Sequence, residues 1–86
     1  MKYIIVSYKS RNNLISFAKL VNRNGIPTQI INTPRSVAIS CGLSIKTDYK
    51  YFSKIVNFVH SSNLSGFLGI YLVNKTNSFE QIDKLY

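Results

Sequence analysis

The sequence is poor in several residue types on which common functional sites depend. Its 86 residues include one cysteine, one histidine, three acidic residues and no tryptophan. A single cysteine cannot form an internal disulfide. Cys41 and His60 together provide too few ligands for a zinc ion or an iron–sulfur cluster. We therefore expect no metal and no cofactor. In a reducing compartment Cys41 should stay a thiol.

Other absences narrow the function classes further. The three carboxylates, Asp48, Glu80 and Asp83, offer no pair for acid–base chemistry, and the four glycines do not follow a phosphate-binding spacing. These gaps favour a carrier or a binding protein over a stand-alone enzyme. No apolar run approaches the ~18 residues of a membrane helix, and the opening MKYIIVSYKSRNN is too polar for a signal peptide. We therefore expect a cytoplasmic protein with no membrane partner.

Basic residues dominate the charged ones that are present. Eleven Lys and Arg against three Asp and Glu give a formal net charge of +8. Such a charge is compatible with an anionic ligand, an acidic protein or nucleic acid. The basic residues are widely spaced, however, with no adjacent pair and no basic block. The pattern is typical of a solvated basic surface and does not favour nucleic-acid binding.

Hydrophobic periodicity predicts alternating strands and helices. The apolar run at 3–8 indicates a buried strand, and Leu14, Phe17, Ala18 and Val21 recur at helical spacing between Arg11 and Gly25. Further strands are predicted at 28–32, 42–47 and 66–73. Before the last of these, Asp48 can cap a second helix, which carries an apolar stripe of Phe52, Ile55, Val56 and Val59. His60 lies one position past this stripe and is predicted to be exposed.

This order predicts the fold class. It is α+β, a ferredoxin-like βαββαβ arrangement in which a four-stranded antiparallel sheet carries two helices on one face. Residues 1–74 form the predicted single domain, and the polar tail 75–86 packs on it as a short helix or an extra strand. RNA-recognition motifs share this fold, but the third predicted strand, GLSIKT, has no aromatic residue to stack on a base. Exposed sheet edges are compatible with a homodimer.

The segment TPRSVAISCG, residues 33–42, is longer than the turn that this fold needs between its second and third strands. It contains the one cysteine. Free cysteines are commonly buried and inert, so Cys41 can be a small core residue. Alternatively, its position before Gly42 exposes the sulfur, and nearby cations lower the pKa of the thiol. The nearest cations in sequence are Arg35, Lys46 and Lys50.

The same segment carries a family resemblance. Thr33-Pro34-Arg35, five residues, then Cys41-Gly42 resembles the most distinctive pattern of a family of small bacterial proteins of unknown function, described as selenium/sulfur carrier protein-like. The resemblance extends to the opening strand, to NRNGIPTQIINTPR and to the run LSIK after the cysteine. Members commonly carry an acidic residue directly after TPR, where this chain has Ser36.

The resemblance implies a carrier whose cysteine holds sulfur or selenium as a persulfide or perselenide, with donor and acceptor proteins as its partners. By motif position, Cys41 is the attachment residue, and Arg35 and Lys46 stabilise the thiolate or bind an anion. Thr33, Pro34, Ser40 and Gly42 shape the loop. The alternative that the composition leaves open is a non-catalytic binding module with a basic surface for an anionic ligand, an acidic protein or RNA.

Overall fold

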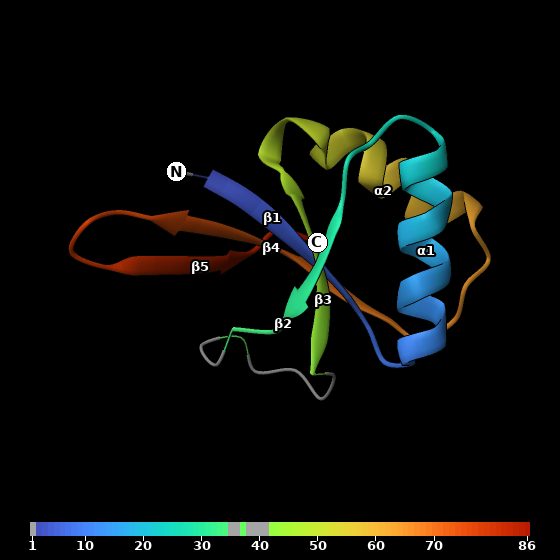
Figure 1. Ribbon diagram of the computed structural model, residues 1–86, viewed down its shortest axis with the longest axis horizontal. Coiled ribbons are helices and arrows are strands. Elements are labelled where there is room, and N and C mark those ends of the chain that lie inside the picture. Colours follow the sequence, from blue (N-terminus) through green and yellow to red (C-terminus); the bar gives the residue numbers. More distant parts are fainter. Residues whose placement is uncertain (1, 35–36, 38–41) are drawn as a thin grey trace.

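A computed structural model gives the fold, and it describes residues 2–34, 37 and 42–86. Figure 1 shows a sheet with the helices α1 and α2 on one side and a hairpin of two strands projecting from the other. The elements follow one another as β1 (Lys2–Tyr8), α1 (Arg11–Arg23), β2 (Gln29–Asn32), β3 (Leu43–Asp48), a short 3-10 helix η1 (Tyr49–Tyr51), α2 (Phe52–Ser61), β4 (Phe67–Lys75) and β5 (Glu80–Lys84).

All five strands pair antiparallel in the order β2-β3-β1-β4-β5. Strand β3 therefore lies between β1 and β2, the two strands that α1 connects, which is the split βαβ arrangement. The predicted order βαββαβ is present, but the prediction of a four-stranded sheet is wrong. Glu80–Lys84 pairs with Tyr71–Lys75 and adds a fifth strand. Of the two predictions for the tail, a short helix or an extra strand, the extra strand is therefore the one observed.

Local signals explain where the helices begin and end. The Ser10 hydroxyl accepts a hydrogen bond from the Asn13 N–H at 3.3 Å and caps α1. Gly25 follows the helix with φ of +89°, a conformation that ends helices and that glycine adopts without strain. Asp48 caps η1 instead of an α-helix, because its carboxylate accepts from the Lys50 N–H and α2 begins only at Phe52.

Two apolar clusters lie on opposite faces of the sheet. The larger one joins strand residues such as Ile4, Val6 and Ile45 to the inner sides of both helices, including Phe17 and Ile55. The smaller one lies on the other face and contains Ile5, Val37 and Val73, with partly buried Tyr3, Ile31, Tyr71 and Ile82 around them. Neither α1 nor α2 covers the smaller cluster. Within the residues that are described, no helix is long and apolar enough to cross a membrane.

Candidate functional site at the β2–β3 connection

The connection between β2 and β3 begins and ends at neighbouring positions. The last ladder pair is Asn32 with Leu43, and the Thr33 N–H then donates to the Gly42 carbonyl at 2.9 Å. This bond extends the hairpin one step beyond the strands. Thr33 and Pro34 are partly buried at this base, whereas Gly42 is exposed. The base therefore holds the first two and the last residue of TPRSVAISCG together.

Buried hydroxyl groups fix this base to the middle of the sheet. The Thr33 Oγ1 lies 2.7 Å from Ser44 Oγ, which in turn lies 3.2 Å from Ser7 Oγ on β1. Ser7 and Ser44 are fully buried. A buried hydroxyl without a partner would cost roughly 1–3 kcal/mol, so the two buried serines favour the arrangement that gives each of them a partner. Neither serine stands out in the sequence, because a serine inside a strand pattern gives no signal of its partner.

Val37 attaches the connection to the second face of the sheet. Its N–H donates to the Pro34 carbonyl at 3.0 Å, and its side chain is 5% exposed. There it packs in the same cluster as Ile5 and Val73, from β1 and β4. The connection is therefore anchored at its base by hydroxyl groups and at Val37 by apolar packing.

The structure separates the predicted site residues into two groups. Thr33, Pro34 and Gly42 lie together at the base, whereas Arg35, Ser40 and Cys41 lie outside the described residues. Lys46 is three residues along β3 from Leu43, roughly 10 Å at the usual rise of a strand. It pairs across the ladders with Gln29 and Ile5, toward the other end of the sheet. Its contribution to a thiolate at position 41 stays a prediction.

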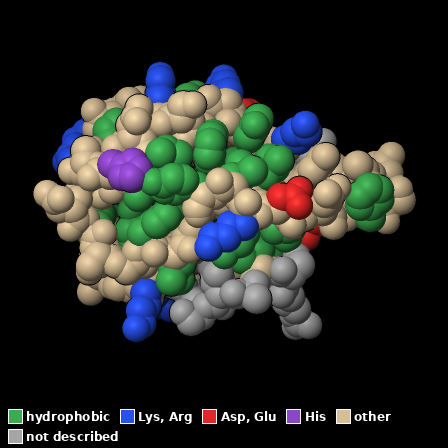
Figure 2. Space-filling model, turned by 180° about the vertical axis from the view of Figure 1, so that it is seen from behind, with side chains coloured by type: hydrophobic (Ala, Val, Ile, Leu, Met, Phe, Trp, Pro, Cys, Tyr) green, Lys and Arg blue, Asp and Glu red, His purple; other side chains and the backbone are tan. Residues whose placement is uncertain are grey.

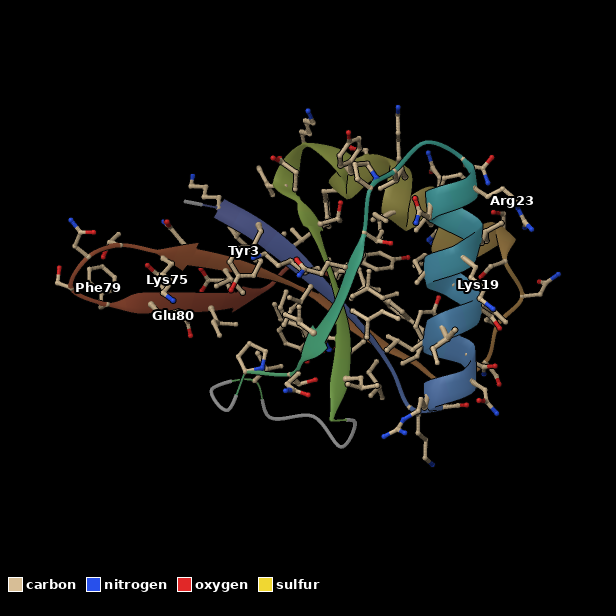
Figure 3. All side chains as sticks on the ribbon, viewed as in Figure 1. Tyr3, Lys19, Arg23, Lys75, Phe79 and Glu80 are labelled. Atoms are coloured by element: carbon tan, nitrogen blue, oxygen red, sulfur yellow. The ribbon has the colours of Figure 1, made fainter. Side chains whose placement is uncertain are left out.

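Lys46 instead contacts an aromatic ring. Its Nζ lies 4.4 Å from the centroid of the Tyr3 ring, within cation–π range. Burial raises the pKa of the Tyr3 hydroxyl, and the negative charge of Glu80 raises it further. Tyr3 therefore stays neutral at physiological pH, and its ring remains a suitable surface for the ammonium. Figure 3 shows Tyr3 beside the part of the hairpin that carries Lys75 and Glu80.

Other chemistry-bearing side chains lie apart from the base. His60 is exposed in the last turn of α2, and its Nε2 hydrogen-bonds the Tyr86 hydroxyl. No cluster of three metal-ligating side chains occurs among residues 2–34, 37 and 42–86. On the face seen in Figure 2, Lys and Arg side chains stand singly instead of forming a stripe. This spacing agrees with their scatter along the sequence.

The comparisons with known proteins agree with the motif. A family model described as "Putative Se/S carrier protein-like" matches residues 2–71, which run from β1 into β4 and include the whole β2–β3 connection. No curated protein and no solved structure matches the chain. The matched part is well over half of the 86 residues. The chain therefore belongs to the family of Se/S carrier protein-like proteins.

Proposed function

We propose that the protein carries sulfur or selenium on Cys41, as a persulfide or perselenide, between a donor protein and an acceptor protein. Family membership over residues 2–71 is the observation that carries this proposal. The cysteine belongs to the segment TPRSVAISCG on which the resemblance rests.

The transfer needs no acid–base pair and no external oxidant. The Cys41 thiolate attacks the outer sulfur of a donor persulfide, and a new S–S bond forms as the donor S–S bond breaks. The donor leaves as a thiolate and takes up a proton from solvent. An acceptor thiolate then attacks the outer sulfur on Cys41 in the same way, which returns Cys41 to its thiolate form. The same steps apply with selenium as the outer atom.

The described ends of the connection support this role. The Thr33–Gly42 bond and the part-buried contact between Thr33 and Ser44 hold both ends of the segment on the sheet. Gly42, the neighbour of Cys41, is exposed. A carrier has to present its cysteine to two different proteins, and a loop on a fixed base meets that need without a closed cleft.

We assign the closer electrostatic role to Arg35, because it belongs to the same segment as Cys41. Positive charge near a thiol favours the thiolate and lowers its pKa. Lys46 would act on the thiolate only through its long-range charge, since its ammonium lies over Tyr3. The effect of Lys46 should therefore be smaller and should disappear at high salt.

The first experiment measures the rate of alkylation of Cys41 against pH in the reduced protein. We expect the pKa of the Cys41 thiol to lie below the free value of about 8.5. In Arg35→Gln this pKa should be clearly higher. Lys46→Gln should change it less, and Lys54→Gln, which removes the same charge from the exposed side of α2, should leave it unchanged.

The second experiment loads the reduced protein from a sulfurtransferase and measures its mass. Wild-type protein should gain one sulfur atom that a second thiol protein can remove, and Cys41→Ser should gain none. A pKa at or above the free value together with no loading would contradict the carrier proposal. A Cys41→Ser variant that keeps all biological activity would instead support the alternative of a basic binding module.

A further inference from the structure

A pocket of about 450 Å³ lies at the end of the sheet away from the β2–β3 connection. It is where β1 begins, β3 ends and the chain enters β2. The residues that line it come from these three segments: Lys2, Tyr3, Pro27, Thr28, Gln29, Lys46, Thr47 and Asp48. Among these residues, the carrier proposal gives a role to Lys46 alone, as a cation that acts on the Cys41 thiolate.

The walls of the pocket are fixed by the sheet. Tyr3 pairs with Asp48 across the β1–β3 ladder, and Gln29 pairs with Lys46 across the β2–β3 ladder. The Thr47 hydroxyl also donates to the Pro27 carbonyl at 2.7 Å, which ties the segment before β2 to β3. The segments that line the pocket are therefore held to one another by ladder pairs and by this hydrogen bond.

Two ammonium groups give the pocket an excess of positive charge. Lys46 is half-buried and is held over the Tyr3 ring, and Lys2 enters from the start of β1. Within the described part of the chain, neither ammonium has a carboxylate partner. A cation that is positioned but not neutralised attracts an anion, most strongly where the wall is apolar and excludes water.

Two carboxylates oppose this attraction, Asp48 in the lining and Glu80, whose negative charge acts on Tyr3. Asp48 also lines the pocket, and its carboxylate accepts from the Lys50 N–H at 2.9 Å as the cap of η1. Two lysines against one aspartate leave a net charge of one positive unit among the lining residues. Gln29 and Thr28 add neutral hydrogen-bond donors beside them. This combination suits a compact anion that presents several oxygen acceptors.

We propose that this pocket binds a small oxyanion, of the phosphate, sulfate or carboxylate class, with the Lys2 and Lys46 ammonium groups as its counter-charges. Lys46 then serves this pocket, and its function does not require contact with Cys41. The proposal is independent of the carrier chemistry, because Cys41→Ser protein should bind the same anion with unchanged affinity.

The test is a titration of the isotope-labelled Cys41→Ser protein with inorganic phosphate, followed by backbone amide shifts. Chloride is adjusted so that the ionic strength stays constant, because a chain of net charge +8 attracts any anion weakly. We expect saturable shifts centred on Thr28, Gln29, Lys46 and Asp48. Parallel titrations with sulfate and acetate show whether the site prefers a tetrahedral oxyanion or a carboxylate.

Charge variants separate the pocket from general attraction. Lys46→Gln and Lys2→Gln should each weaken binding about fivefold, as expected for one ion contact of about 1 kcal/mol near a surface. Asp48→Asn should strengthen binding about twofold to fivefold by the same argument, and asparagine can still cap η1. Lys54→Gln is the control, because it lowers the net charge equally from an exposed position outside the pocket.

Four results would overturn the proposal. The first is a set of shifts that spread over the surface without saturating. The second is a loss of affinity in Lys54→Gln as large as that in Lys46→Gln. The third is an Asp48→Asn variant that binds no more tightly than the wild type. Binding in the wild-type protein that Cys41→Ser lacks would likewise show that the anion sits at the thiol and not in this pocket.

Discussion

At the scale of residues, Tyr8 buries a polar group in an apolar environment. Its ring is fully buried between Phe17 and Phe67, with centroid separations of 5.2 and 5.6 Å. Its hydroxyl is buried as well and makes no hydrogen bond within the described residues. Burial raises the pKa of Tyr8 to about 12, and the Ser62 side chain acts in the opposite direction as the smaller cause. The aromatic packing outweighs the cost of the unpaired hydroxyl.

Removing this hydroxyl should therefore help the fold. Tyr8→Phe keeps the ring and should raise the free energy of unfolding at pH 7 by about 1 kcal/mol. The difference in free energy of unfolding between the variant and the wild type should grow above pH 10. The reason is that the unfolded wild type loses the Tyr8 proton there, while the folded state keeps it up to about pH 12. Wild-type stability then falls with pH by up to about 2–3 kcal/mol relative to the variant. Urea unfolding of both proteins from pH 7 to 12 measures this, and parallel stability curves would contradict it.

At the scale of elements, β5 is an edge strand and is mostly polar. Of its five residues only Ile82 is partly buried, and it packs with Ile5 and Val73 on the face without helices. It pairs directly with Val73 in the β4–β5 ladder. Most of this hairpin lies beyond residue 71, where the family match ends. Ile82 is therefore the side chain that joins the added strand to the apolar core.

Shortening Ile82 tests whether β5 is part of the cooperative fold. A fully buried Ile→Ala change costs about 2–5 kcal/mol, so Ile82→Ala should lose about 1–2 kcal/mol in urea unfolding. The matched control is Ile30→Ala on β2, the opposite edge strand, where the isoleucine is 42% exposed. That variant should lose no more than about 0.5 kcal/mol. Equal losses in the two variants would mean that β5 adds no more to stability than an exposed edge residue.

The sequence predicts the elements whose apolar residues recur at a regular spacing. It does not predict the features that depend on how the strands pair. The stripe of Leu14, Phe17, Ala18 and Val21 identifies α1, and the same four residues are buried in the structure. The sequence EQIDK has a single apolar residue, so nothing in its pattern separates an edge strand from a helix. Lys46 shows the corresponding problem in the site. It is five positions from Cys41 in the chain, but an extended strand carries it away from the connection.

At the scale of the whole molecule, positive charges greatly outnumber negative ones. The chain carries a net +8, and its Cα atoms extend 38 × 26 × 19 Å, so like charges lie within a few Debye lengths of one another. Such self-repulsion destabilises the compact state. Lys19 and Arg23 are four residues apart on α1, and Figure 3 shows both on the outer side of that helix. Like charges at this spacing cost about 0.2–0.5 kcal/mol in a helix.

Reversing one charge of this pair should stabilise the molecule in low salt. Lys19→Glu replaces a repulsive i, i+4 pair with an attractive one and lowers the net charge by two, so we expect a gain of about 0.5–1 kcal/mol. Most of this gain should vanish in ~1 M NaCl, where the Debye length is about 3 Å. Arg23→Glu changes the net charge equally, but it places a carboxylate in the last turn of α1, where the helix dipole disfavours it. Its gain should therefore be smaller by about 0.3–1 kcal/mol in low salt. Equal gains in the two variants would show that the total charge alone, and not its position on α1, limits stability.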